Sequence, residues 1–291
     1  MGTTWSVRLA APEALDRARL LRAVQTRLDG LVLQMSHWRR ESLLCGFNRA
    51  PAGVWAVLPP DFAAVMRVGL DIAARSGSAF DPAIGALVDL WGFGPVKTTG
   101  APTGYDIDEA RDRSGWGRLE FDAASARLRQ PGGLQLDLSG IAKGYGVDAV
   151  VAVLAKHGVR HCLVEIGGEL AGRGLKPDGE PWWVDLENPD AKAPPFRIAL
   201  HECAVATSGD YIRGAHNLDP RTGWPATQAV TSVSVVHASA MHADAWASAL
   251  TVLGAGAGLA LAEREGLAAR IVVRTQRGFE EAVSPALQAL L

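Results

Sequence analysis

One segment, from Asp137 to Glu169, constrains the fold of this chain more than any other part of the sequence. Leucines alternate with polar residues over 134–138, which is the pattern of a strand with one buried face. That pattern places the carboxylate of Asp137 on the face opposite the leucines. A helix with an apolar stripe opens directly afterwards, at Ser139 or Gly140. The segment therefore predicts a strand, a carboxylate and a helix start in immediate succession.

Lys143 is unusual because it stands in the first turn of this predicted helix. A cation in the first turn opposes the helix dipole, which costs about 0.3–1 kcal/mol. The cost disappears when an anion lies between the ammonium group and the free backbone N–H groups of the helix start. Together with the carboxylate of Asp137, Lys143 predicts a phosphate site with a metal ion nearby.

Length and composition exclude several classes of protein. The chain has 291 residues, 48% of them hydrophobic, so it can bury a large core in one large domain or in two closely packed lobes. Its net charge is −2 and its basic residues are scattered, which argues against nucleic acid as a partner. The three cysteines, Cys45, Cys162 and Cys203, are far apart and odd in number, which is the pattern of neither a disulfide framework nor a zinc site.

Two features concern localisation. No secretory signal precedes the first predicted strand, so the sequence as given predicts a cytoplasmic protein, or a periplasmic or membrane-anchored one if a leader has been removed. The uncharged run Ala245–Ala262 is about long enough to span a bilayer. Three glycines interrupt it, so we expect a packed helix, a turn and a second short helix, with no transmembrane segment.

The remaining pattern is of strands in neighbouring groups with helices between the groups, which is typical of the α+β class. We expect helices over 12–35 and 60–76 and from 243; a loop and short helix at 76–94; a polar surface insertion at 96–115; a hairpin turn at 176–179 with its return strand at 182–187; and further strands at 1–10, 119–121, 127–129, 196–200, 204–207, 230–236 and 269–273.

A second candidate site lies on the helix that begins near residue 243. Asp244 and Ser248 are four residues apart, so both oxygens lie on one helix face. A carboxylate and a hydroxyl are hard oxygen ligands, which suit Mg²⁺ better than zinc. The plainer interpretation is an acidic residue near a helix N-terminus and a small core serine.

Three other positions have both a chemical and a plain structural interpretation. His216, just before a proline–glycine turn, is either a general base or a solvated loop histidine. Phe80 and Asp81 are either ligand contacts or a core residue and a turn residue. The Gly167–Gly168 pair marks either a bulge or a backbone that approaches a ligand closely.

Several catalytic motifs are missing from the sequence. It contains no G-x-x-x-x-G-K-[ST] loop, no G-x-G-x-x-G after a strand, no H-E-x-x-H and no G-x-S-x-G elbow. These absences exclude the P-loop, Rossmann, zincin and α/β-hydrolase interpretations.

Eight blocks, in order along nearly the whole chain, resemble the ApbE-type flavin transferases, the FAD:protein FMN transferase family. The blocks are MGT at 1–3, MSHWRRES…FN at 35–48, SGSAFDP…LWGFG at 76–94, DLSGIAKGYGVD at 137–148, VEIGGEL at 164–170, ATSGDY at 206–211, HNLDPRTG at 216–223 and ADAWASAL at 243–250. The resemblance implies an α+β fold related to a duplicated T-fold arrangement of antiparallel sheets with packed helices. It implies one flavin transferase domain over 1–291.

The resemblance also implies an activity. FAD is bound, its pyrophosphate is cut with help from Mg²⁺, and FMN passes through its phosphate to a threonine or serine hydroxyl of an acceptor protein while AMP leaves. By position, the FAD contacts are Met1, Trp38, Ala79, Phe80, Asp81, Asp137, Lys143 and Leu218. The metal ligands are Gly140, Asp244 and Ser248, and His216 matches the histidine proposed to deprotonate the acceptor hydroxyl.

Some residues depart from the family pattern. Ser248 stands where threonine is usual, Trp38 where tyrosine is usual, and Leu43 and Cys45 where Glu and Ser are common. Two rival functions use the same residues: an Mg²⁺-dependent FAD pyrophosphatase that gives FMN and AMP, and a flavin-binding protein without turnover.

Overall fold

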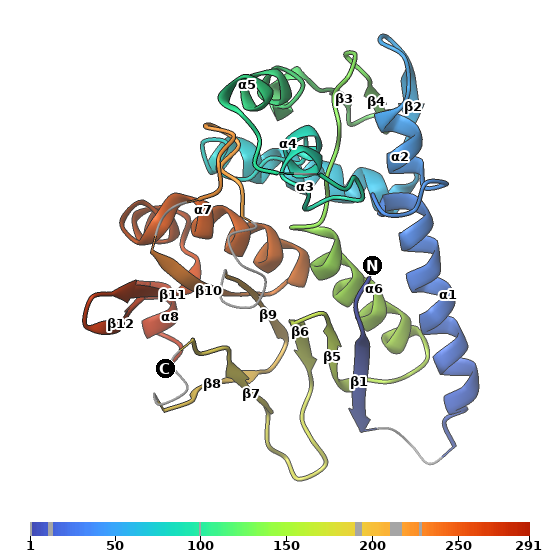
Figure 1. Cartoon of the computed structure of the whole chain (residues 1–291). Helices are drawn as coiled ribbons and strands as arrows, with labels where there is room; N and C mark the ends of the chain where they lie inside the picture. The colour runs from blue at the N-terminus through green and yellow to red at the C-terminus, as the bar shows by residue number, and fades with distance from the viewer. Residues whose placement is uncertain (1, 11–13, 99, 190–193, 210–216, 227–228) are drawn as a thin grey trace. The chain divides into compact units, whose positions relative to one another are not determined.

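A seven-stranded antiparallel sheet dominates the first of two compact units into which contacts divide the chain (Figure 1). The computed structural model describes residues 2–10, 14–98, 100–189, 194–209, 217–226 and 229–291. Unit 1 comprises Met1–Asp29, Lys143–Gly214 and Gln228–Leu291, and unit 2 comprises Gly30–Ala142 and Ala215–Thr227.

The sheet of unit 1 has the strand order β1-β5-β6-β9-β10-β11-β12, with every neighbouring pair antiparallel. Its strands are β1 (Trp5–Ala10), β5 (His161–Ile166), β6 (Glu169–Arg173), β9 (Cys203–Ser208), β10 (Val230–His237), β11 (Ala268–Thr275) and β12 (Gly278–Val283). A separate pair is formed by β7 (Trp182–Leu186) and β8 (Phe196–Leu200). The helices are the start of α1 (Arg17–Met35), α6 (Ala142–Lys156), α7 (Ala240–Glu265) and α8 (Pro285–Gln288).

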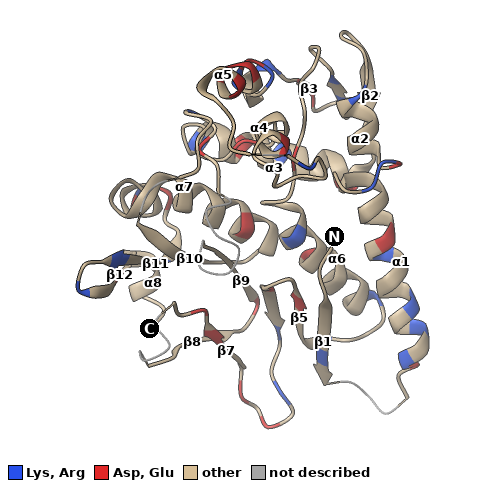
Figure 2. Ribbon diagram, in the orientation of Figure 1, with Lys and Arg blue, Asp and Glu red and all other residues tan. Residues whose placement is uncertain are grey.

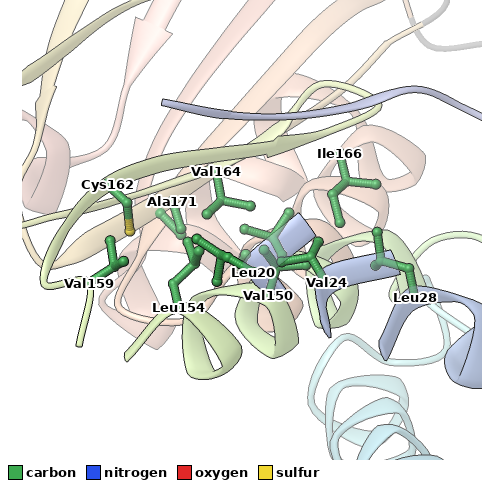
Figure 3. Packing of buried hydrophobic residues seen from close by; sticks show 13 residues of the cluster. Leu20, Val24, Leu28, Val150, Leu154, Val159, Cys162, Val164, Ile166 and Ala171 are labelled. Carbon is green, nitrogen blue, oxygen red and sulfur yellow. The ribbon is translucent and has the colours of Figure 1, made fainter. Parts of the chain in front are cut away.

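Strand β5 shows why this sheet is buried on both faces. Cys162, Val164 and Ile166 point to a cluster that α1 and α6 complete with leucines and valines (Figure 3). Leu163, on the opposite face, packs against side chains of β7 and β8. Apolar residues on both faces of a strand are expected when each face is covered by another layer.

The Gly167–Gly168 pair forms the two-residue turn between β5 and β6. Ile166 pairs with Glu169 across the turn, and both glycines have positive φ, 64° and 104°. Positive φ at both central positions suits a tight hairpin, and glycine adopts it without steric cost. The pair is therefore a hairpin turn, not the bulge that the sequence left open.

Helix α7 contains the break that its glycines predict. Gly254 has φ 79° and ψ 174°, so two helical segments meet there at a kink. Among the described residues, α7 is the one helix whose length and composition would allow it to cross a membrane, and 61% of its apolar 18-residue window is buried inside the protein. This burial agrees with the packed, interrupted helix that the sequence predicts.

Unit 2 packs short helices beside a small sheet. It contains α2 (Leu43–Asn48), α3 (Pro60–Arg75), α4 (Gly85–Leu90), α5 (Gly104–Asp112), the 3₁₀ turn η1 (Trp116–Arg118), and the strands β2 (Trp55–Val57), β3 (Glu120–Asp122) and β4 (Arg127–Arg129) in the order β2-β4-β3. A core cluster joins α4 and α5 through Leu87, Ile107 and Ala110, and includes Leu218.

The predicted strand at 134–138 is wrong, although the segment is buried. Leu134, Leu136 and Leu138 are at most 1% exposed, but the segment belongs to no sheet. At Leu136 a side chain takes the place of a neighbouring strand: the Asn48 amide donates to Leu136 O at 3.0 Å, and Leu136 N donates to Asn48 Oδ1 at 2.8 Å. Asp137 N donates to Pro82 O at 2.9 Å. Alternation predicted burial correctly, but the backbone partner came from tertiary structure.

Two other local predictions are also wrong. Residues 96–115 are not only a surface insertion, because they contain α5, whose Ile107 and Ala110 are buried. The turn at 176–179 forms, with Gly179 N donating to Lys176 O at 3.0 Å, but the strand after it pairs with β8 and not with β6.

The class prediction is confirmed, because the protein mixes helices with antiparallel sheets. The helix predicted over 60–76 is observed as α3, and that over 12–35 as α1. Figure 2 shows Lys and Arg interspersed with Asp and Glu along the ribbon, as the scattered charges of the sequence suggest.

Asn48→Ala tests the buried extended segment. The substitution removes both partners of the Leu136 backbone, and a buried unsatisfied polar group costs about 1–3 kcal/mol. We expect the free energy of unfolding to fall by about 2 kcal/mol, measured by urea denaturation. Gln25→Ala, which removes an exposed helix hydrogen bond to Asp29, should change it by only a few tenths.

Candidate active site

Helices α6 and α7 cap each other within unit 1. The carboxylate of Asp148 on α6 accepts hydrogen bonds from Ala240 N at 2.9 Å and Met241 N at 3.0 Å at the start of α7. In return, Gly144 N at the start of α6 donates to Asp244 Oδ2 on α7 at 2.9 Å. The first N–H groups of a helix have no intrahelical acceptor, so each carboxylate satisfies donors that the other helix leaves free.

Gly144 allows this exchange because the two helices touch there. A Cβ atom at Gly144 would collide with the carbonyl oxygen of Ala240 and lie 2.8 Å from Asp244 Cβ. No side chain larger than hydrogen therefore fits between the helix starts. The G-Y-G run after Lys143 has a packing reason that the sequence alone does not reveal.

Lys143 meets two buried carboxylates. Its ammonium group forms an ion pair with Glu169 Oε1, and lies 3.8 Å from Asp244 Oδ1. Glu169 is 1% exposed and Asp244 is 5% exposed. The anion that the sequence places between the lysine and the helix N–H groups is thus present as a protein carboxylate, that of Asp244.

The charges in this cluster do not balance, since two carboxylates share one ammonium group. Burial, followed by the negative charge of Asp244, raises the pKa of Glu169 to about 8. Burial also raises the pKa of Asp244, although Lys143 and the Gly144 N–H act in the opposite direction. A further positive charge near this cluster would therefore favour both carboxylates in their ionised form.

These residues fit a hard cation such as Mg²⁺. Glu169 Oε2 is buried and has no hydrogen-bond partner among the described residues, and Ser248 lies one turn beyond Asp244 on α7. No group of three or more His, Cys, Asp or Glu in the described part of the chain could hold a metal alone. Mg²⁺ in proteins is usually held by one or two carboxylates together with water and substrate phosphates, and Asp244 and Glu169 could supply such carboxylates. Gly140 lies in the turn before α6, in unit 2.

Asp137 belongs to a second polar cluster, within unit 2. Its Oδ1 accepts from Ser139 N at 2.7 Å and from Ser139 Oγ at 2.5 Å. Its Oδ2 lies 3.3 Å from His37 Nδ1. Asp89 is close enough for its pKa to respond: burial raises the pKa most, and the charge of Asp137 raises it further, while His37 lowers it.

The remaining predicted contacts of unit 2 have clear structural roles. The carboxylate of Asp81 accepts hydrogen bonds from Ala83 N at 2.7 Å and from Trp116 N at 3.1 Å. It therefore connects the segment before α4 to the first residue of η1. Phe80 and Ala79 are buried, 6% and 2% exposed, which agrees with a core position.

Trp38 and Leu218 differ sharply in exposure. Trp38 is 61% exposed, and its ring lies 5.2 Å from that of His37, an accessible surface for stacking. Leu218 is 5% exposed, in the cluster with α4 and α5. Met1 and His216 lie outside the described residues, so their roles stay predictions.

Sequence reasoning missed three polar residues of these clusters. Glu169 had a signal, because an acidic residue directly follows the two glycines of a hairpin turn and then enters a buried strand. His37 and Asp148 gave none, since their partners are 100 and 91–93 residues away. A local pattern cannot report such a contact.

Comparison with known proteins identifies the family. The model of the ApbE family matches residues 1–271. The chain belongs to the ApbE family. It is a transferase enzyme, and curated members named FAD:protein FMN transferase are similar to it throughout. The one from Vibrio cholerae is 33% identical over 303 residues, covering 100% of this chain and 90% of the relative; the one from Salmonella typhimurium is 31% identical over 306 residues, covering 100% and 87%.

Solved structures of ApbE proteins have the same fold. The flavin transferase ApbE from Vibrio cholerae has a TM-score of 0.95 at 33% identity, covering 100% of this chain and 96% of that one. The apo form of Pseudomonas stutzeri flavinyl transferase ApbE has a TM-score of 0.93 at 38% identity, covering 99% and 93%. The family assignment and the α+β fold predicted from the sequence are therefore confirmed.

Gly144→Ala tests the contact between the helix starts. The added methyl group must displace the Ala240 carbonyl, and overpacking of this kind costs about 1–3 kcal/mol. Gly256→Ala is the matched control: Gly256 is helical and nothing lies within 4 Å of its Cβ position, so alanine should stabilise the protein by about 0.5–1 kcal/mol. Equal unfolding midpoints in urea for the two variants would contradict the close contact.

Asp81 should make stability depend on pH. Burial raises its pKa from 3.8 to about 6, so the folded state holds this proton over a range in which the unfolded state has lost it. Its contribution is therefore full below about pH 4 and falls as the pH rises to about 6, by about 3 kcal/mol. Urea unfolding of wild type and Asp81→Asn from pH 4 to 7 should show the wild type losing stability relative to the variant. A constant difference would refute the assignment.

Proposed function

We propose that this chain cleaves FAD and transfers FMN through its phosphate to a threonine or serine hydroxyl of an acceptor protein, with release of AMP and with Mg²⁺ as the metal ion. The observation that carries the proposal is the buried cluster of Lys143, Glu169 and Asp244 at the start of α6. Its ammonium group and surplus carboxylate charge, with the Ser248 hydroxyl one turn beyond Asp244 on α7, suit a cation and a phosphate together.

In this reaction no residue of the protein needs to form a covalent bond to the substrate. Phosphoryl transfer depends mainly on positioning and on neutralising charge at the phosphate oxygens. Lys143 would offer its ammonium group to the pyrophosphate, while Glu169 and the helix contacts hold that side chain in place. Asp244 would hold the metal with Ser248, one turn further along α7. When bound, Mg²⁺ supplies Lewis-acid stabilisation of charge on the phosphate oxygens.

The acceptor hydroxyl needs a base. We assign that role to His216, which by sequence precedes the turn at 217–226. The acceptor oxygen forms a bond to the FMN phosphorus, the bond from that phosphorus to the bridging oxygen breaks, and AMP leaves with the electron pair. His216 takes the proton of the hydroxyl.

Hydrolysis is the main competing reaction, because water can take the place of the acceptor at the same phosphorus. Incubation of the protein with FAD, Mg²⁺ and a candidate acceptor separates the outcomes. An acceptor that gains the mass of an FMN phosphoester, with equimolar AMP, supports the proposal. An unmodified acceptor beside free FMN would indicate a pyrophosphatase, and unchanged FAD would indicate a flavin-binding protein without turnover.

Asp244→Asn tests the metal assignment. Asparagine retains an oxygen that can accept the Gly144 N–H but loses the charge, so the fold should persist while Mg²⁺-dependent AMP release falls at least about 100-fold. AMP is measured by chromatography, with the unfolding midpoint as the control for folding. Asp29→Asn, at an exposed carboxylate on α1, should leave AMP release unchanged. Full activity in Asp244→Asn would refute the assignment.

A further inference from the structure

An exposed aromatic surface in unit 2 lies on the turn that follows the proposed base, His216, in the sequence. Trp224 is 47% exposed, and its ring centroid is 5.6 Å from that of Trp91, which directly follows α4. The two rings pack edge to face, a favourable geometry for aromatic side chains, so each ring restricts the movement of the other. We call Trp91 and Trp224 the indole pair.

The turn that carries Trp224 is a short hairpin. Asp219 N donates to Trp224 O at 2.8 Å. Ala226 N donates to Asn217 O at 2.8 Å, and Asn217 is the residue after His216. These backbone hydrogen bonds connect the arm that leads from the proposed base to the arm that carries the exposed indole.

The hairpin is fixed against two helices of unit 2 (Figure 1). The indole N–H of Trp91 donates to Gly223 O at 2.9 Å. Gly223 has a φ of 77°, and a Cβ atom there would lie 2.6 Å from the side chain of Ile107 and 2.9 Å from that of Arg111, both on α5. An aromatic surface held in this way loses little conformational entropy when a partner covers it.

Two arginines at this hairpin already have carboxylate partners. Arg221 donates two hydrogen bonds to Asp219, from Nε to Oδ1 and from Nη2 to Oδ2, both at 2.8 Å. Arg111 pairs with Asp108 at 3.1 Å. Cations that are already paired offer little net attraction to a charged ligand, so the indole pair favours an uncharged segment with apolar side chains.

Under the proposed function, the acceptor protein must approach this hairpin. Its hydroxyl has to meet His216, so the acceptor residues beside that hydroxyl lie against the part of the chain next to the base. Trp224 pairs with Asp219, three residues after His216, and three residues of chain span at most about 11 Å. An extended acceptor segment advances about 3.3 Å per residue, so a side chain within about five residues of the hydroxyl reaches Trp224.

We propose that the indole pair binds the acceptor protein through an uncharged, extended segment with an aliphatic side chain within about five residues of the modified threonine or serine. The inference rests on the proposed function and deepens it, because it assigns the surface that favours an acceptor hydroxyl over water. Trp224 is a residue of acceptor recognition and takes no part in the cleavage of FAD.

Transfer kinetics test this assignment. The probes are the acceptor protein that gains FMN in the incubation described above and a synthetic peptide that spans its modified residue. Trp224→Ala should raise the KM for both probes at least about tenfold, because truncation of a central tryptophan removes much of an apolar contact. The kcat at saturating acceptor, the Kd for FAD and the rate of FAD hydrolysis without acceptor should stay unchanged.

Two further variants separate recognition from a general effect on the fold. Trp224→Phe keeps an aromatic ring and should recover most of the lost affinity for the acceptor. Trp183→Ala is the matched control, because Trp183 is also 47% exposed but lies on β7 in unit 1, and it should leave the KM unchanged. Urea unfolding checks that each variant folds.

A double-mutant cycle connects the protein to the peptide. Alanine in place of the aliphatic side chain of the peptide should raise the KM of the wild-type protein at least about fivefold, and should have no further effect in Trp224→Ala. The peptide substitution needs no change in the protein, so its effect does not depend on the folding of a variant.

An unchanged KM in Trp224→Ala would overturn the inference, as would a parallel loss of FAD binding, additive effects in the cycle, or a modified segment without an aliphatic side chain near its hydroxyl. If FAD is hydrolysed and no protein gains FMN, the proposed function fails and this inference fails with it. FMN transfer that is equal in wild type and Trp224→Ala would contradict this inference alone.

Discussion

The exchange of caps between α6 and α7 is the interaction on which the proposed active site depends. Asp148 satisfies the first N–H groups of α7, and Asp244 satisfies Gly144 N at the start of α6. Each helix start would otherwise leave buried donors unpaired, so neither helix can move without exposing the other's donors. The same contact sets Asp244 beside Lys143, and it is possible only because Gly144 has no side chain. Close packing of the two helices and the placement of Asp244 beside Lys143 therefore both require glycine at position 144.

The charge imbalance at Lys143 follows from that geometry. Asp244 lies at the start of α6 and Glu169 follows the β5–β6 turn, and among the described residues the ammonium group of Lys143 is the cation that pairs with both. Buried charges of like sign are unfavourable, which is why the pKa values of Glu169 and Asp244 rise. A cation beside these two carboxylates would lower the free-energy cost of keeping both ionised. Unit 2 also contains buried polar atoms that have no hydrogen-bond partner among the described residues, namely Asp137 Oδ2 and His37 Nε2.

The sequence anticipated those features whose cause is local. Apolar periodicity located α3, the two adjacent glycines of 167–168 located a sharp change in the chain, and Gly254 broke α7 where it was expected to. It failed where a distant partner replaced a local one. The segment at 134–138 alternates as a strand does, but the backbone of its central residue, Leu136, bonds to the side chain of Asn48, 88 residues earlier. In the same way, residues 96–115 have the composition of a surface loop, but they contain a helix whose Ile107 and Ala110 are buried against the core.

What the sequence by itself determined is therefore the identity of the parts: an α+β chain of the ApbE family, with Lys143 in a helix start and Asp244 with Ser248 on one helix face. Apolar periodicity, glycine positions and the order of motifs depend on residues that are close in the sequence, so they can be read without knowing the fold. Only the tertiary structure decided that Asp244 caps α6, that Glu169 pairs with Lys143, and that His37 faces Asp137. The physical reason is that a buried charge or donor is satisfied by whatever group lies next to it in space, and the sequence places that group about 100 residues away in two of these three contacts.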